Sequence, residues 1–150
     1  MAMFSSFNIS ASALTAQRLR MDVVASNIAN ATSTRAQLVD GRWVPYQRKM
    51  VVMEARTAQP SFSSVLENTL QGSVGQGVRV TQIVNDTEPF KRVYNPTHPD
   101  ADESGYVLMP NVDLLKEQVD LLDATRAYEA NVTAFNASKA MFTKALEIGK

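Results

Sequence analysis

The chain has 150 residues, and its 15 lysines and arginines balance its 15 aspartates and glutamates, so the formal net charge is zero. Nucleic acids and anionic lipids bind to basic protein surfaces, which a neutral chain lacks. We therefore expect neither kind of partner. The sequence contains no cysteine, which excludes disulfides, thiolate nucleophiles and cysteine-ligated zinc. At this length we expect one domain with a moderate core.

The N-terminal segment, MAMFSSFNISASALTAQRLR, has no basic residue before Arg18. A secretory signal requires a positively charged start, a continuous apolar run and a cleavage site of small residues, and this segment has none of them. No run reaches the roughly 18 apolar residues that a bilayer-spanning helix needs. We therefore expect a soluble chain without direct membrane insertion that, if exported, leaves the cytoplasm without a cleaved signal peptide.

The first predicted helix spans residues 9–31. Its apolar residues recur every seven positions at Leu14, Met21 and Ile28. This spacing places them on one helix face. Ser10 or Ser12 is expected to cap the start of the helix. A cluster of asparagine, threonine and serine at residues 27–33 predicts its end, because such side chains compete for backbone hydrogen bonds.

The second predicted helix spans residues 112–148 and carries the strongest periodic signal. Its large residues recur every seven positions, with one more on the same side: Leu114, Leu121, Tyr128, Phe135, Phe142 and Val132. Asp113 or Asn111 is expected to cap its start. A helix of this length with such a stripe is typical of coiled-coil-like pairing, so we expect the two terminal helices to pair through their stripes.

A band of small residues follows the same helix on a different side. It consists of Ala124, Ala127, Ala130, Ala134 and Ala137. At about 100° per residue this band lies roughly opposite the large stripe. Large residues on one side and small residues on the other predict neighbours on two sides. Two terminal helices can cover only one of these sides, so the pattern favours self-assembly.

The middle of the chain, residues 33–111, has the features of short strands and turns. Strands are predicted at residues 47–55, 78–84 and 106–109, with a turn at DTEP, residues 86–89. Residues 59–77 are rich in serine, glutamine, asparagine and glycine and predict a mobile linker.

The predicted fold class is therefore mainly α with a small β part. Residues 1–32 and 112–150 are expected to form a helical coiled-coil core, and residues 33–111 a β-hairpin or extended middle region. This arrangement is predicted because apolar residues repeat with a helical spacing at the two ends of the chain and with a strand-like spacing in its middle.

Possible chemistry concentrates in the stretch YNPTHPDADESGYV, residues 94–107, which holds the only histidine. Asp100 begins a spacing similar to that of a calcium loop, but Asn111 occupies the position that requires a bidentate glutamate. Zinc requires three or four ligands, and His98 has no second histidine to join it. We predict no metal, no cofactor and no catalytic residue, and interpret the stretch as a rigid connector stiffened by its prolines.

Three segments resemble a known family. They are SASALTAQRLRMDVVASNIANATSTR at residues 10–35, GVRVTQIVNDTEPFKRVYNPTHPDADESGYVLMPNVD at residues 77–113, and VDLLDATRAYEANVTAFNASKAM at residues 119–141. Together they resemble the FlgC type of bacterial flagellar basal-body rod protein, within the wider family of flagellar rod and hook axial proteins. The central segment, with its Tyr-x-Pro-x-His-Pro core, is the most specific of the three.

The resemblance implies a structural subunit and not an enzyme. It implies a proximal rod subunit that assembles into a helical axial tube, transmits torque and surrounds the export channel used in motility. It further implies that the paired terminal helices form the inner wall of the tube, with the β-rich middle outside. Contacts between subunits are expected at the alanine band and at the connector, through Ala127, Ala130, Ala134, Ala137, Tyr94, Pro96, His98 and Pro99.

The same resemblance implies partners and a location. The partners are other proximal and distal rod subunits, the adaptor between rod and MS ring, and the flagellar type III export apparatus. The location is the rod of the basal body, outside the cytoplasmic membrane in the periplasmic or cell-wall zone.

Two alternatives remain open. A soluble helical coiled-coil adaptor would have the same heptad pattern but would form a small oligomer of defined size. A weak metal-binding enzyme would depend on His98 and Asp100. Native mass and a metal titration separate these possibilities from a rod subunit.

Overall fold

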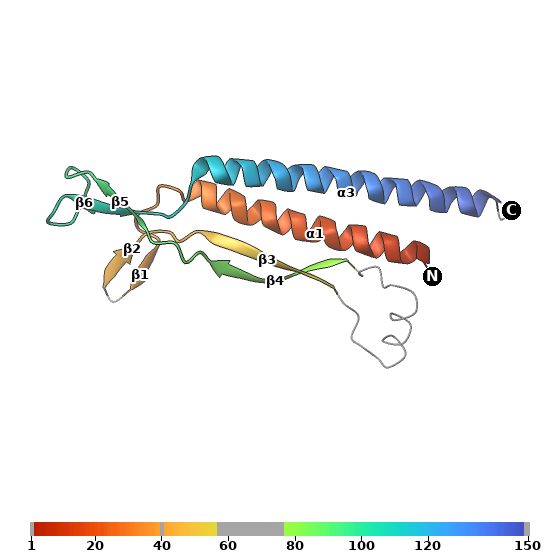
Figure 1. Ribbon diagram of the computed structural model, residues 1–150, viewed down its shortest axis with the longest axis horizontal. Coiled ribbons are helices and arrows are strands. Elements are labelled where there is room, and N and C mark those ends of the chain that lie inside the picture. Colours follow the sequence, from red (N-terminus) through yellow and green to blue (C-terminus); the bar gives the residue numbers. More distant parts are fainter. Residues whose placement is uncertain (1, 40, 57–76, 149–150) are drawn as a thin grey trace, which may run out of the picture. The chain divides into compact units, whose positions relative to one another are not determined.

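Two long helices dominate the computed structural model, which describes residues 2–39, 41–56 and 77–148. They are α1 (Ala2–Ala29, 28 residues) and α3 (Leu114–Ile148, 35 residues) (Figure 1). The strands between them are β1 (Gln37–Val39), β2 (Arg42–Val44), β3 (Lys49–Ala55), β4 (Val78–Asn85), β5 (Lys91–Tyr94) and β6 (Tyr106–Met109). The prediction of two terminal helices with a small β part is confirmed.

Helix α1 begins earlier than predicted, at Ala2 instead of residue 9. The prediction that Ser10 or Ser12 caps it is therefore wrong, because both lie inside the helix. No glycine or proline interrupts residues 2–9, and the Ser12 hydroxyl donates back to the Ile9 carbonyl at 2.7 Å. The helix ends within the asparagine-rich cluster that predicted its end. There the backbone N–H and the side-chain Nδ2 of Asn30 donate to the Ser26 carbonyl at 3.1 and 2.9 Å.

Helix α3 begins at Leu114, two residues after the predicted start. The predicted cap Asp113 is confirmed, since its carboxylate accepts the Leu115 N–H at 3.0 Å. The other candidate, Asn111, does not cap the helix. It is buried, and its side chain bonds to segments far away in the sequence.

The strands form three separate pairs, β1–β2, β3–β4 and β5–β6. Strand β6 has the predicted bounds, whereas β3 starts two residues later and β4 ends one residue later than predicted. β5 and β6 are antiparallel, with Tyr94 opposite Tyr106. Most of the predicted linker at 59–77 lies outside the described residues.

The β1–β2 hairpin was missed in the sequence. Its signal was the Asp40-Gly41 dipeptide between two short apolar runs, which favours a tight hairpin turn. Gly41 has a φ of 79°, in the left-handed region that favours glycine. Leu38 and Trp43 are opposite each other in this hairpin, and both are exposed.

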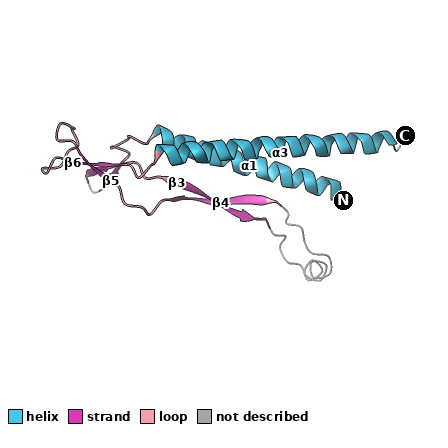
Figure 2. Cartoon of the chain, turned by 45° about the horizontal axis from the view of Figure 1, so that its top comes forward, coloured by secondary structure: helices cyan, strands magenta, loops and turns pink. Residues whose placement is uncertain are grey.

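The chain divides into two compact units, and each contains part of both helices. The first unit combines the described parts of Met1–Leu19, Val52–Gln82 and Ala124–Lys150. Within it, α1 lies between α3 and the β3–β4 pair (Figures 1 and 2). The Phe7 ring meets the edges of two α3 rings, with centroid distances of 5.1 Å to Phe135 and 6.4 Å to Phe142.

The second unit combines Arg20–Val51 and Ile83–Asp123. It contains the last turns of α1, the first turns of α3 and the hairpins β1–β2 and β5–β6. Its buried apolar side chains include Val23, Val24, Tyr46, Val107 and Val112. The division predicted from the sequence, with both helices apart from a middle region, stays a prediction.

In the first unit, β4 is anchored to α1 at its first residue. The Val78 N–H donates to the Ser12 hydroxyl at 3.2 Å. The preceding Gly77 has a φ of 107°, and a Cβ added there would overlap the Ser12 Oγ. Gly77 is therefore required both by the backbone conformation and by the close approach of the strand to the helix.

This anchor predicts unequal effects of alanine at two glycines. Gly41→Ala carries only the left-handed backbone penalty, about 1–2 kcal/mol, because nothing lies within 4 Å of the added Cβ. Gly77→Ala should cost more, since the Ser12 side chain must also move and give up its hydrogen bonds. Amide exchange should show faster exchange in β4 for Gly77→Ala and no change there for Gly41→Ala. Equal protection of β4 in both variants would contradict this account.

Candidate functional site

The second unit contains a buried ionic cluster, which we define as Asn27, Arg48, Asp86, Asn111, Glu117 and Asp120. Its centre is the Arg48 guanidinium, just before β3. Nε donates to Glu117 at 2.7 Å, Nη1 to Asp86 at 3.1 Å and Nη2 to Asp120 at 3.4 Å. Glu117 is 0% exposed. A carboxylate buried this deeply is tolerated only with a paired cation and satisfied hydrogen bonds.

The electrostatics of the cluster keep its central groups charged. Burial opposes the charge on Arg48, but hydrogen bonds to Glu117 and Asp86 raise its pKa above the ordinary value. The backbone N–H of Glu88, 3.1 Å from the Asp86 carboxylate, lowers the pKa of Asp86, and Arg48 lowers it further. Arg20 gives Asp120 a second cation at 3.1 Å. At neutral pH Arg48 and Asp86 are therefore both charged.

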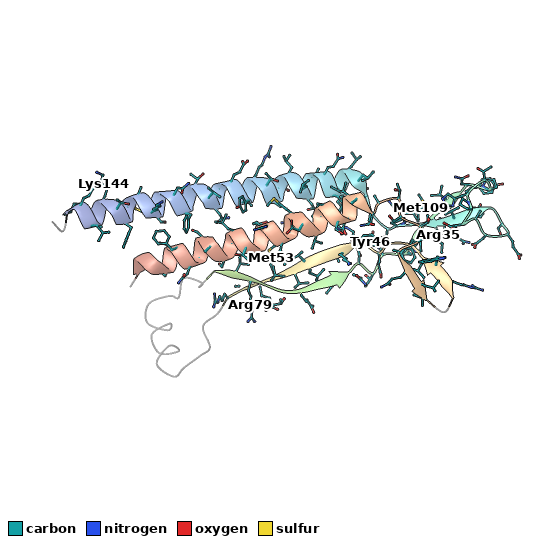
Figure 3. The ribbon with its side chains drawn as sticks, turned by 180° about the vertical axis from the view of Figure 1, so that it is seen from behind. Arg35, Tyr46, Met53, Arg79, Met109 and Lys144 are labelled. Atoms are coloured by element: carbon teal, nitrogen blue, oxygen red, sulfur yellow. The ribbon has the colours of Figure 1, made fainter. Side chains whose placement is uncertain are left out.

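Asn27 connects α1 to the cluster and is 1% exposed. Its Nδ2 donates to the Lys49 carbonyl at 2.8 Å and to Glu117 at 2.9 Å. Its Oδ1 accepts the Lys49 N–H and the Tyr46 hydroxyl, both at 3.0 Å. These four bonds use the whole capacity of an amide side chain. Tyr46 lies beside the C-terminal end of α1, as Figure 3 shows.

Asn111 joins two further segments. Its Oδ1 accepts the Arg48 N–H at 2.8 Å, and its Nδ2 donates to the Glu88 carbonyl at 3.0 Å. The Asp86 N–H donates to the Arg48 carbonyl at 2.8 Å. The cluster thus joins the end of α1, the start of β3, the segment after β4 and the start of α3. All of its groups have partners within the chain and all except Asp120 are buried, so the cluster positions chain segments.

The connector at residues 94–107 is fixed to the segment after α1. Arg35 Nε donates to Asp100 at 2.7 Å, and the Thr34 hydroxyl donates to the second carboxylate oxygen at 2.8 Å. The hydrogen bonds from Arg35 and then Thr34 lower the pKa of Asp100, and Asp100 in turn raises that of Arg35. His98 Nδ1 accepts the Asp100 N–H at 3.1 Å. His98 Nδ1 and both carboxylate oxygens of Asp100 are therefore engaged within the chain.

Two further observations concern the described part of the chain. Within residues 2–39, 41–56 and 77–148, no three histidine, cysteine, aspartate or glutamate side chains are grouped so that they could hold a metal ion. Neither α1 nor α3 is long and apolar enough over its described residues to cross a membrane.

The predicted large stripe is mostly half-buried. This applies to Leu14, Met21, Ile28, Leu121, Tyr128, Val132, Phe135 and Phe142, whereas Leu114 is exposed. The fully buried positions of α3 are Glu117 and Ala124, which follow Leu114 and Leu121 by three residues. Both i and i+3 positions of a heptad face inward. Ala124 was predicted to lie in a band roughly opposite the large stripe, but it is buried on the same side as that stripe.

The residues predicted to contact other subunits lie mostly at the surface. Ala130, Ala134 and Ala137 are exposed, and Ala127 is half-buried. In the connector, Tyr94, Pro96 and Pro99 are exposed and His98 is half-buried.

The sequence analysis missed the ionic cluster. A signal existed at Glu117, a carboxylate three residues after a stripe position, where an apolar residue is expected. Asn27 was taken only as part of a helix end. Arg48 and Asp86 carried no local signal, because their role depends on partners 38 to 72 residues away.

Removing the cation should destabilise the second unit strongly. Arg48→Met leaves three carboxylates, one of them fully buried, without their shared cation. Losing one partner of a buried pair costs about 3–5 kcal/mol, which urea unfolding can measure. The matched control is Arg79→Met, because Arg79 is 63% exposed, 3.4 Å from Glu54, and points away from α1 (Figure 3). The control should lose less than about 1 kcal/mol, and similar losses in both variants would contradict the role of the cluster.

Acid should weaken the same unit. The folded-state pKa values of Asp86 and Asp100 lie below the ordinary 3.8. As the pH falls through 3.8 to those lower values, the unfolded chain binds protons that the folded chain does not, so the free energy of unfolding decreases. Their stabilisation is fully present at higher pH. Asp100→Asn should make this decrease shallower in urea unfolding below about pH 5, and an unchanged slope would contradict the assignment.

Comparison with known proteins assigns a family. Residues 7–37 match the family described as flagella basal body rod protein, and residues 103–148 match the family described as flagellar basal body rod FlgEFG protein C-terminal. The flagellar basal-body rod protein FlgC of Bacillus subtilis is 59% identical over 152 residues, covering 100% of both chains. Its namesake in Borreliella burgdorferi is 45% identical over 99% of this chain and 98% of its own. The FlgC protein of Salmonella typhimurium is 39% identical over the full length of both chains.

Identity at this level over the full length, together with the two helices and the small strand pairs, shows that the chain belongs to the FlgC family of flagellar basal-body rod proteins.

Proposed function

We propose that this chain is a structural subunit of the proximal rod, which assembles with other rod subunits into a helical axial tube. In this role the tube transmits torque and surrounds the channel through which flagellar proteins are exported. The family supports a structural rod component and does not favour the alternative of a soluble adaptor. The buried, mutually satisfied ionic cluster supports the same reading, because it stabilises a fold without offering a reactive group.

The observation that carries the proposal is the outer surface of α3. In the second unit, Leu115, Val119 and Leu122 are 75%, 59% and 50% exposed. Their spacing of four and three residues places them on one helix face. A surface helix of a monomeric protein normally presents polar residues to solvent, and an exposed apolar face marks an interaction surface.

The part of α3 in the first unit has an outer surface of a different kind. Ala130, Ala134 and Ala137 are exposed there, followed by the exposed Met141 and Ile148. Small residues allow a neighbouring helix to approach closely, and the large ones at the end supply apolar area. We propose that neighbouring subunits cover this surface together with the exposed face at Leu115, and that the exposed Tyr94, Pro96 and Pro99 add contacts beyond the helices.

Within one subunit, α1 and α3 are proposed to pair in coiled-coil fashion. The ring contacts of Phe7 with Phe135 and Phe142 support this pairing in the first unit. The bond from Asn27 to Glu117 and the ion pair of Arg20 with Asp120 support it in the second. Packing within the subunit thus uses one face of α3 and leaves another for neighbours.

The proposed partners are proximal and distal rod subunits, the adaptor between rod and MS ring, and the type III export apparatus. The proposed location is the rod outside the cytoplasmic membrane, in the periplasmic or cell-wall zone, reached without cleavage of a signal peptide. The family supports the basal body as the general location and rod components as the general class of partner.

The proposal predicts that two substitutions on α3 stop motility for different reasons. Phe135→Asp should prevent pairing of α1 with α3, because it buries an unpaired charge. Ala130→Glu should leave the subunit folded but block a neighbour. Each variant is expressed in the source bacterium lacking the native gene, with swim-plate radius, secretion and circular dichroism of the purified chain measured. Both variants should fail to swim, and only Phe135→Asp should lose helicity.

Two control variants make this test specific. Lys139→Glu changes the charge at an exposed position of α3 that is already charged, and His98→Ala removes the ring of the connector. Both should swim nearly normally. If secreted Ala130→Glu swims normally while His98→Ala is paralysed, the assembly proposal is wrong and a chemical role of the connector must be considered.

A further inference from the structure

The second unit contains a hollow of about 510 Å³ between the end of α1, the β1–β2 hairpin and the start of β3. This volume is within the range of about 300–1,000 Å³ of binding pockets. Its lining includes two cations, Arg35 and Lys49, and no carboxylate. The other lining groups are amides, hydroxyls and a few apolar side chains. The charge of the hollow therefore favours an acidic occupant.

Most polar groups of the lining already have partners within the chain. Ser33 donates to Asn30 at 3.2 Å, and Gln47 donates to the Asp86 carbonyl at 2.7 Å. Arg35 is bound to Asp100. Lys49 differs: among the described residues its ammonium group contacts only the Tyr46 ring, 5.8 Å from the centroid. Lys49 is thus the available cation of the hollow.

The C-terminal end of α1 lies beside the hollow, through Ser26 and Asn30. Carbonyl groups at a helix C-terminus carry partial negative charge, which would repel a carboxylate. Here the Ser26 carbonyl accepts two hydrogen bonds from Asn30, and the Ile28 carbonyl accepts the Ala31 N–H at 3.2 Å. Of these two residues, Ser26 lines the hollow, and its carbonyl is engaged within the chain.

The same unit presents an acidic turn at its surface, formed by Asp102, Glu103, Ser104 and Gly105. The Gly105 N–H donates to the Asp102 carbonyl at 2.8 Å, and the Asp102 N–H donates to the Tyr106 carbonyl at 2.9 Å. Gly105 has a φ of 77°, and a Cβ added there would lie 2.9 Å from the Tyr94 ring. Asp102 and Glu103 are exposed. Neither carboxylate has an ion-pair partner among the described residues. The turn is therefore a rigid projection with free negative charge.

We propose that, in the assembled rod, the acidic turn of one subunit docks into the hollow of a second copy of this chain, with Glu103 facing Lys49. The charges of the two surfaces are complementary, and the turn loses little conformational freedom on binding because it is already ordered. The turn and the hollow are different surfaces, so the contact is heterologous and can repeat from copy to copy. The inference rests on the proposed rod function, because it requires assembled subunits.

Disulfide cross-linking tests the contact directly, because the chain contains no cysteine of its own. Lys49→Cys and Glu103→Cys are placed on separate copies, one with an affinity tag, and both are expressed in the source bacterium lacking the native gene. A disulfide forms only when the two Cα atoms approach to about 4.4–6.8 Å. Isolated basal bodies are oxidised and analysed without reductant.

The expected result is a cross-linked heterodimer at least tenfold more abundant than in a control pair of Lys49→Cys with Arg79→Cys. Arg79 is exposed on β4 and belongs to neither surface. If tagged protein is present in the basal bodies but the heterodimer does not exceed the control, the docking proposal is wrong while the rod function stands. If the wild-type chain is absent from basal bodies, both proposals are wrong.

Charge reversal gives an independent readout. Lys49→Glu should reduce swim-plate radius at least twofold, and the double variant Lys49→Glu/Glu103→Lys should restore at least half of the loss. The Lys49 side chain can be changed without removing the bonds to Asn27, because those use backbone atoms of Lys49. No restoration in the double variant, with both proteins secreted, would overturn the assignment of Glu103 as the partner of Lys49.

Discussion

The buried pair of Arg48 and Glu117 is the constraint on which the second unit depends. Removing two charges from water is costly, and the cost is offset only if every partner is in place. Glu117 therefore requires Asn27 as well as Arg48, and Arg48 requires Asp86. Because these residues come from the two helices, from the start of β3 and from the segment after β4, the burial of one ion pair determines where four chain segments meet.

Because the centre of the second unit is polar, few apolar side chains are buried there and others remain at the surface. The apolar side chains buried in the second unit are few, whereas Leu115, Val119 and Leu122 remain at the surface of α3. In a monomer this distribution would reduce solubility. In a subunit of an assembly it separates two tasks: directional hydrogen bonds and ion pairs specify the fold, and the non-directional hydrophobic effect favours contact with neighbours. The neutral net charge is consistent with close packing of many copies.

The proline-rich connector, residues 94–107, combines groups bound within the chain with groups exposed at the surface. Its one histidine and its first aspartate are engaged with each other and with Thr34 and Arg35. At its surface the connector presents the exposed Tyr94 ring, which lies close to Gly105, and the exposed carboxylates of the acidic turn. A rigid connector of this kind suits contact with a large partner better than binding of an ion.

The sequence by itself determined the features that depend on near neighbours along the chain. The existence and approximate span of α3, the asparagine end of α1 and the bounds of β6 follow from local propensity, spacing and capping, whereas the choice of Asp113 over Asn111 as the cap of α3 came from the structure. Only the tertiary structure decided the function of Asn27, Asn111 and Glu117. Periodicity states which face of a helix a residue occupies, but whether a polar residue is buried there depends on partners brought from distant segments. The same limit explains Ala124, which shares its residue type with exposed alanines and lies at 0% exposure because of what packs against it.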